Sequence, residues 1–339
     1  MTAKQNLVEL ISKGVQAART SGATVDEVFQ DASAKTGKNE FLFFIKPEVL
    51  DAEGGVKVNE VLSLILEKIE AFGLNIHQVK VLSADYLEAN NIIAQHYGVI
   101  NSIAKNAVQN MSEGAREKFA QLYGSPVTEL KVLGGLEVLE QYPHFDAFSL
   151  DYIWQNLENK KLAGGTYAEV VKVDNETLYV INGFHPRQLR HFTEKGRSIV
   201  VMTLSGDLDW KTARNGFIGA TNPASAASGS IRRTLLDEKE ALGLAEVGQG
   251  TNGVHLSAGP VEALVELRRY NSDFTVAGGE KKFSDFSFGK KLEAELGDKI
   301  NDITSNVNVV VDGKSTSIFD LTEEKNSDEA IELLKGLSF

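Results

Sequence analysis

The spacing of hydrophobic residues predicts a helix at the start of the chain. Apolar residues recur every three or four positions from Leu7 to Val15, which is the period of a helix buried along one face. Thr24 stands before an acidic turn, in the manner of a residue that caps a helix. We therefore expect residues 6–34 to be helical.

The following segments alternate between strand and helix patterns. Residues 41–45 form a continuous apolar run that ends at Lys46-Pro47, which predicts a buried strand with a lysine at its end. Further along, we expect an amphipathic helix over residues 58–71, a second strand over 74–82 and a helix over 83–97.

The rest of the chain contains two hairpin patterns among further helices and strands. The order strand–helix–strand, occurring twice, predicts an α+β fold of the ferredoxin-like kind, an antiparallel sheet with helices on one face. A hypothesis for the two hairpins is that they share one small sheet. Helices are expected over 101–122, 207–213, 260–268 and 327–337, and a further helix in the segment that includes Arg190. Strands are expected over 198–204 and 254–256. The two hairpins are expected to pair 166–173 with 177–181 around 174–176, and 307–311 with 315–319.

Length, charge and composition narrow the class of protein. A chain of 339 residues suits two domains, or one domain with a large insertion. Its net charge of −12 argues against a broad nucleic-acid surface, although a few local arginines suffice for a small phosphorylated ligand. The absence of cysteine excludes disulfides, thiolate catalysis and cysteine-bound zinc. With neither a membrane-length apolar run nor a signal-peptide pattern, we expect a cytoplasmic protein without a membrane partner.

One stretch brings together residues suited to phosphoryl transfer. Residues 219–232 are rich in Gly, Ala, Ser and Pro, so backbone and small side chains can approach a phosphate closely. Arg214 and Arg232 provide planar, always-charged groups for phosphoryl oxygens. His255 follows shortly after, and a neutral imidazole can attack phosphorus and carry the phosphoryl group covalently. The combination predicts transfer through a phosphohistidine.

These segments resemble the nucleoside diphosphate kinase family. The similarity covers residues 39–97 and 184–270, a little under half the chain. Its motifs occur in the family's order, and the spacing from His255 to Glu266 fits the helix that follows the family's histidine. The motifs are Phe43-Phe44-Ile45-Lys46-Pro47, His96-Tyr97, Gly219-Ala220-Thr221-Asn222-Pro223-Ala224, Gly229-Ser230-Ile231-Arg232, and Asn252-Gly253-Val254-His255 with Ser257.

The resemblance implies a ping-pong reaction between nucleotides. His255 would take the γ-phosphoryl group of a nucleoside triphosphate and pass it to a diphosphate, with Glu266 orienting the imidazole. Mg²⁺ is implied as the metal, held by phosphates and water and by no protein ligand. The implied substrate-binding residues are Lys46 at the transferring phosphoryl group, Arg214, Thr221 and Arg232 at the terminal phosphates, Asn252 at the ribose, Tyr97 in the phosphate and sugar site, and Phe184 or His185 at the base.

The chain departs from the family pattern near the site. Arg214 stands one residue farther from Gly219 than usual, so a bulge or shift is required. Glu48 replaces the usual aspartate, and Leu256 replaces a glycine beside the histidine, which alters how closely the backbone can approach. An aspartate that usually follows the histidine is missing, which removes a carboxylate.

The organisation implied by the resemblance is a kinase-like core with three additions. These are a helical extension over residues 1–38, a mixed subdomain inserted over 98–183 and a C-terminal extension over 271–339, with the core formed by 39–97 and 184–270. The family's members self-associate, so a homo-oligomer is expected. Two alternatives stay open: a related phosphotransferase with another acceptor, and a non-catalytic nucleotide-binding regulatory protein.

Overall fold

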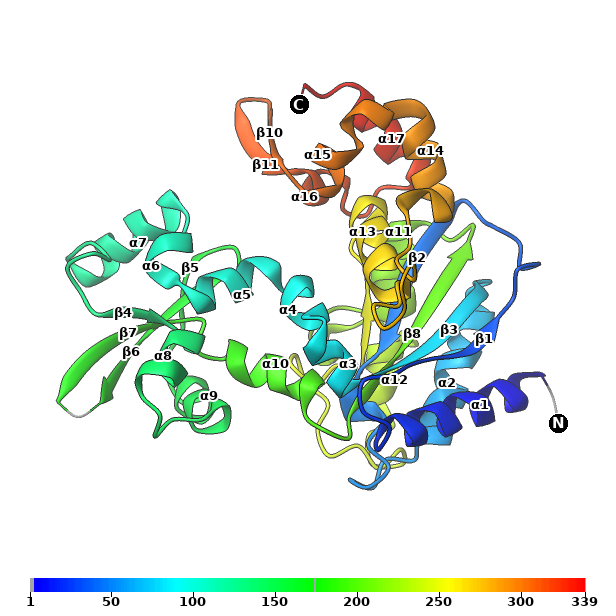
Figure 1. Cartoon of the computed structure of the whole chain (residues 1–339), viewed down its shortest axis with the longest axis horizontal. Coiled ribbons are helices and arrows are strands. Elements are labelled where there is room, and N and C mark those ends of the chain that lie inside the picture. Colours follow the sequence, from blue (N-terminus) through cyan, green and yellow to red (C-terminus); the bar gives the residue numbers. More distant parts are fainter. Residues whose placement is uncertain (1–2, 174, 339) are drawn as a thin grey trace. The chain divides into compact units, whose positions relative to one another are not determined.

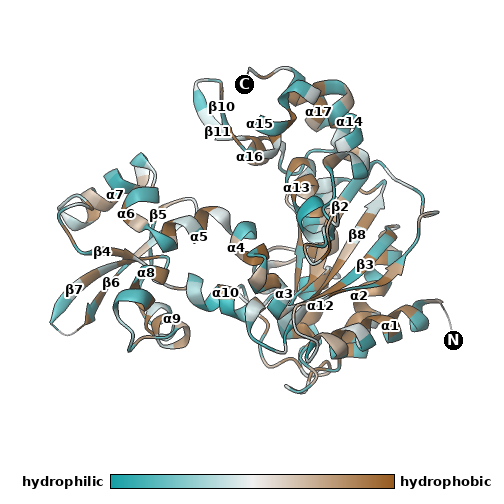
Figure 2. Ribbon diagram, viewed as in Figure 1, coloured by the Kyte–Doolittle hydropathy of each residue, from teal (hydrophilic) through white to brown (hydrophobic). Residues whose placement is uncertain are grey.

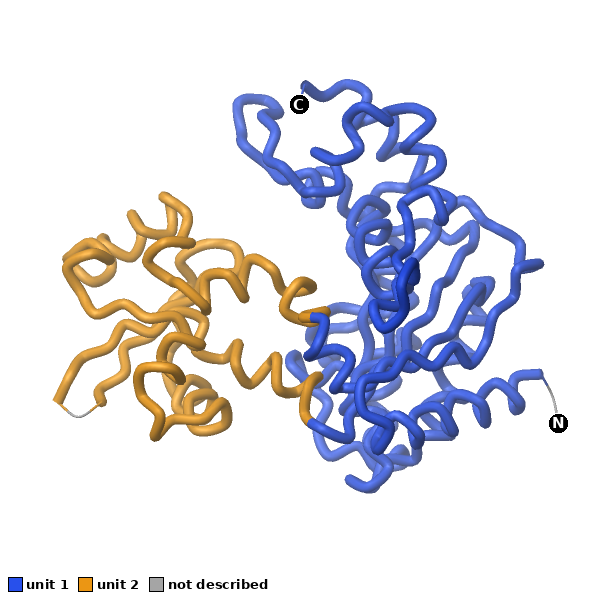
Figure 3. Tube along the Cα trace, in the orientation of Figure 1, with its two compact units in different colours: residues 1–90, 195–339 blue, residues 91–194 orange. Residues whose placement is uncertain are grey.

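Antiparallel strand pairing organises the larger part of the chain. The structure, a computed structural model, describes residues 3–173 and 175–338 (Figure 1). Contacts divide the chain into two units (Figure 3): residues 1–90 with 195–339, here called the core unit, and residues 91–194, the inserted unit. The fold is α+β, and in the described part of the chain no helix combines the length and apolarity needed to cross a membrane.

The core unit is built on a five-stranded sheet in the order β1-β3-β8-β2-β9, with every neighbouring pair antiparallel. The nine residues of β8 are all buried, as expected for a largely apolar strand paired on both sides. The strands expected over 41–45, 74–82, 198–204 and 254–256 are thereby confirmed. The strands are β1 (Val25–Gln30), β2 (Asn39–Ile45), β3 (Asn75–Ser83), β8 (Ser198–Gly206) and β9 (Val254–Leu256).

Helices cover both faces of this sheet, so the expectation of helices on one face was wrong. Side chains alternate along β2, and Phe43 packs in the main core cluster with residues of helices α1 (Ala3–Ala18) and α2 (Val58–Ala71). Phe44 points the other way, toward Tyr270 of α13 (Pro260–Asn271). Figure 2 shows the hydrophobic colour running along the central strands between these layers. Shorter elements of this unit are η1 (Pro47–Val49), α3 (Ala84–Ala89), α11 (Trp210–Thr212), η2 (Ala213–Ile218), η3 (Pro223–Ser225) and α12 (Ile231–Asp237).

The segment after α13 belongs to the core unit and does not form a unit of its own. Its hairpin was predicted correctly, but it makes a separate two-stranded sheet, so the hypothesis of one sheet shared by both hairpins was wrong. The elements are η4 (Phe283–Asp285), α14 (Ser287–Leu296), η5 (Gly297–Lys299), α15 (Ile300–Thr304), β10 (Asn308–Val311), β11 (Lys314–Ser317), α16 (Ile318–Thr322) and α17 (Ser327–Lys335).

The inserted unit has its own four-stranded mixed sheet in the order β4-β7-β6-β5, in which β4 and β7 are parallel. The predicted hairpin is confirmed as β6 and β7, while Asp174 of its turn lies outside the described residues. This unit is wider on both sides than the predicted insertion. Its elements are α4 (Ile92–His96), α5 (Gly98–Lys105), α6 (Ala107–Asn110), α7 (Glu113–Tyr123), β4 (Val132–Gly134), α8 (Gly135–Gln141), α9 (Ala147–Gln155), β5 (Lys160–Ala163), β6 (Thr166–Val173), β7 (Glu176–Ile181) and α10 (His185–Thr193).

Three expected helices differ from the structure. The first ends at Ala18, and the region expected to continue it contains the edge strand β1, whose start is fixed because Thr24 donates its backbone N–H to the Ser83 hydroxyl. The helix expected over 83–97 is interrupted at Asn91, which has a left-handed backbone with φ of 53°. The helix expected over 101–122 is divided into α5, α6 and α7.

Candidate functional site

The pairing of β2 with β9 places His255 opposite Phe44. The two rings stack with centroids 4.5 Å apart and planes inclined by 20°. At the same end of the strand pair, Lys46 donates its backbone N–H to the carbonyl of Gly253 at 2.9 Å. Gly253 has φ of 79°, which favours glycine, and a Cβ atom there would lie 2.5 Å from Leu235 Cδ1, so the leucine side chain would have to shift. Local strand pairing thus brings the predicted histidine and lysine to one end of the sheet.

Helix α13 supplies the carboxylate that orients His255. Glu266 Oε2 lies 3.0 Å from His255 Nε2, and the same oxygen accepts a short hydrogen bond from the Ser257 hydroxyl. Glu266 is only 3% exposed. With Glu266 ionised, its carboxylate can only accept, which assigns the proton to Nε2 and leaves the lone pair of a neutral imidazole on Nδ1. The predicted partnership of Glu266 with the second ring nitrogen is therefore present in the geometry.

Two arginines bracket His255 along the outer edge of β9. Because His255 pairs with β2, the carbonyls of Val254 and Leu256 point away from that strand. Arg232 donates from NH2 to Val254 O at 3.0 Å, and Arg214 donates from NH1 to Leu256 O at 3.1 Å. Within the part of the chain that is described, Arg214 Nε is buried without a hydrogen-bond partner. This edge therefore holds concentrated positive charge with unused donor capacity.

Lys46 lies in a buried polar cluster beside this edge. Its Nζ donates to Asn252 Oδ1 at 2.7 Å, and Asn252 Nδ2 donates to the carbonyl of Thr221 at 3.0 Å. Burial lowers the pKa of Lys46; the Glu48 carboxylate opposes this shift, and the Arg232 guanidinium adds to it. The lysine is thus held by a neutral amide. The structure brings together Lys46, Thr221, Arg232 and Asn252, as predicted, around the start of β9.

The segment between Arg214 and Gly219, where the resemblance implies one residue more than usual, lies in a π-helix. Residues Ala213–Ile218 form η2, whose wider turn accommodates one residue more than an α-helix does. The expected bulge is therefore confirmed. Leu256, the replacement beside the histidine, is buried in the core cluster on the face opposite His255, so its side chain does not crowd the imidazole.

Glu262 is a site residue that the sequence analysis missed. Its Oε2 accepts the backbone N–H of Ala258 at 2.9 Å, at the turn after His255 where the resemblance led us to expect an aspartate. Burial raises the pKa of Glu262 to about 7, the Glu266 charge adds to this rise, and Arg214 opposes it. The available signal was the four-residue spacing of Glu262 and Glu266, which places both on one helix face.

Three residues predicted for the nucleotide site, two of them alternatives for the base, belong to the inserted unit. Phe184 packs against its apolar core, with its ring centroid 5.8 Å from Trp154. His185, the alternative at the base, is fully buried, and its two ring nitrogens lie near Gln188 and Asn101. Tyr97 lies between α4 and α5 of the same unit. Nucleotide contacts of Tyr97 and of Phe184 or His185 stay predictions.

Neither models of known protein families nor curated proteins match this chain.

Proposed function

We propose that this protein transfers the γ-phosphoryl group of a nucleoside triphosphate to a nucleoside diphosphate through a phosphohistidine at His255. The observation that carries the proposal is the arrangement around this residue. Its Nε2 is directed at buried Glu266, while Arg214 and Arg232 reach the strand edge on either side of it. A fixed imidazole flanked by cations is what in-line phosphoryl transfer requires.

In the first half-reaction, Nδ1 of His255 forms a bond to the γ-phosphorus while the bond to the bridging oxygen breaks. The nucleoside diphosphate leaves with that electron pair. In the second, the terminal oxygen of another diphosphate attacks the same phosphorus and the P–N bond breaks. Glu266 compensates the positive charge that the ring gains on phosphorylation and keeps its plane in place.

The cations and polar groups of the core unit would bind the phosphates and sugar. Lys46, Arg214 and Arg232 would neutralise phosphoryl charge, with Thr221 and Asn252 completing the site. Displacement of Asn252 by phosphate at Lys46 would exchange a neutral partner for a charged one, which favours the ammonium form. Tyr97 and Phe184 are proposed for the sugar and base.

Mg²⁺ would come with the nucleotide. The carboxylates here already accept internal bonds, Glu266 from His255 and Ser257, and Glu48 from the Gly253 N–H. This donor set suits an ion held by phosphate oxygens and water, whose chemistry is to neutralise the β and γ phosphates.

The strand order is compatible with the ferredoxin-like interpretation, which, like a homo-oligomer and a cytoplasmic location, remains part of the proposal.

The test is incubation of the protein with Mg²⁺ and γ-labelled ATP, followed by a chase with unlabelled GDP. We expect acid-labile label on the wild type and on His144→Ala, an exposed-histidine control, but none on His255→Ala. Passage of the label to GTP supports the kinase reaction. Label that stays on the protein indicates another acceptor, and ATP binding without label indicates a regulatory protein.

A further inference from the structure

The C-terminal segment brings two acidic residues to the helix that carries Arg214. Glu323 Oε1 lies 3.6 Å from Arg214 NH2, and Glu324 Oε1 accepts a hydrogen bond from Asn215 Nδ2 at 3.4 Å. Adjacent side chains of an extended chain point to opposite sides. Glu324 instead has a left-handed backbone with φ of 57°, a conformation that non-glycine residues seldom adopt, and both acids contact successive residues of one helix.

The backbone that carries these acids is packed directly against the turn after His255. Glu324 donates its N–H to Ala258 O at 3.0 Å. A Cβ atom at Gly259 would lie 2.5 Å from the carbonyl oxygen of Thr322, so the two segments are in close contact. The C-terminal segment is therefore built into the surroundings of the candidate site.

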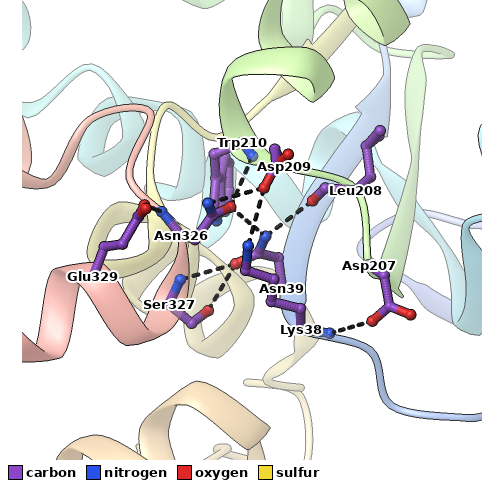
Figure 4. A network of polar contacts seen from close by, with 9 residues as sticks. All are labelled: Lys38, Asn39, Asp207, Leu208, Asp209, Trp210, Asn326, Ser327 and Glu329. Atoms are coloured by element: carbon purple, nitrogen blue, oxygen red, sulfur yellow. Dashed lines mark hydrogen bonds and ion pairs between the residues drawn. The ribbon is translucent and has the colours of Figure 1, made fainter.

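A buried asparagine pair anchors the same segment on its other side (Figure 4). Asn39, at the start of β2, donates to Asn326 Oδ1 at 2.8 Å and accepts the backbone N–H of Ser327 at 2.9 Å. Asn326 also donates to Asp209 Oδ1 at 2.9 Å, just before α11, and receives the N–H of Trp210. Since α11 continues directly into η2, this network fixes the segment relative to Arg214.

The side chain of Glu323 is held much less firmly than its backbone. It is 47% exposed, and its distance to Arg214 is too long for a hydrogen bond. Such a pair compensates charge but does not orient the guanidinium, whose NH1 is directed by Leu256 O. The Glu323 charge also acts on Glu262. It is a smaller cause of the raised pKa of Glu262, behind burial and the Glu266 charge.

We propose that Glu323 is a built-in competitor for the anion-binding position at Arg214, a carboxylate that an incoming phosphate must displace. This inference rests on the proposed function, because it takes the competing anion to be a nucleotide phosphate. The rigid backbone keeps the acid close to Arg214, while the exposed side chain can leave. The C-terminal segment thereby lowers the affinity of the site for nucleotides.

The experiment compares the full-length wild type with Glu323→Gln, Glu323→Asp and Glu332→Gln. Glu332 lies on α17 and pairs with Lys335, so its variant makes the same charge change away from Arg214. The dissociation constant for ADP with Mg²⁺ is measured by calorimetry, and the KM for ATP by His255 labelling. Exposed ion pairs of this kind correspond to an affinity change of about two- to fivefold.

We expect Glu323→Gln to lower both constants about two- to fivefold, with a smaller effect in high salt, and Glu323→Asp and Glu332→Gln to match the wild type. Unchanged or raised constants in Glu323→Gln would overturn the inference while leaving the proposed function intact. A wild type that neither binds ADP nor becomes labelled would overturn the proposed function instead.

Discussion

Replacement of Glu262 by glutamine should stabilise the protein in alkaline solution and have little effect in acid. Glutamine keeps the carbonyl oxygen that accepts the Ala258 N–H but removes the charge. The rise in the pKa of Glu262 from 4.5 to about 7 corresponds to roughly 3 kcal/mol of unfavourable free energy once the group is ionised in the folded state. Glutamine introduces an amide NH2 group at this half-buried position, which offsets part of that gain, so we expect a net gain of about 1–3 kcal/mol.

The pH window follows from the sign of the shift. Below about pH 4.5 the carboxyl group is protonated in both folded and unfolded chains, so the wild type loses nothing there. Between about pH 4.5 and pH 7 the unfolded chain releases this proton while the folded protein retains it, so the wild type loses stability relative to the variant over this window, and the loss is complete above about pH 7.

Urea unfolding at about pH 4 and about pH 8.5 measures this difference. Glu293→Gln, an exposed acid on α14, is the matched control and should stay within about 0.5 kcal/mol of the wild type at both values. A Glu262→Gln protein that is no more stable than the wild type at about pH 8.5 would refute the reasoning, as would an equal gain at both pH values.

Three further changes test the packing and chemistry of the site. Gly253→Ala should destabilise the fold by about 2–4 kcal/mol in urea unfolding, because the residue has a positive φ and its new Cβ would contact Leu235. Gly250→Ala, with open space around it, should be near neutral, and equal stability of the two variants would contradict this. Glu266→Gln should slow labelling of His255 about 10–100-fold through loss of a charge-assisted hydrogen bond, and a rate within about threefold of wild type would count against the assigned role. Asn39→Ala should cost about 2–3 kcal/mol of unfolding free energy by leaving buried partners unpaired, and an unchanged urea midpoint would show that the network is dispensable.

The central strand β8 could be predicted from the sequence, whereas the edge strand β1 could not. Residues 199–202 of β8 form a continuous apolar run because both faces and both edges of the strand are covered, so the pattern itself identifies it. Residues Val25–Gln30 are mostly half-exposed and include two acids, and they form a strand because β3 offers an edge. That edge is a tertiary feature, and local propensity gives no sign of it.

The candidate site divides in a similar way. The positions of His255 and Lys46 depend on one strand pair, and that of Glu266 on the adjoining helix, so short motifs sufficed to predict them. Arg214 and Glu323 are 109 positions apart in the sequence, as are Asn215 and Glu324. Both contacts depend on how the C-terminal segment packs against the rest of the core unit. No local pattern encodes such a contact.

The positions at which this chain differs from the nucleoside diphosphate kinases that it resembles bear on the proposed function. The extra residue before Gly219 is taken up by a π-helix, and Arg214 still reaches the carbonyl of Leu256. Leu256 itself faces the core, and Glu262 supplies a carboxylate at the turn where an aspartate is missing. Each of these departures leaves the surroundings of His255 intact, which supports the proposed phosphoryl transfer at this histidine.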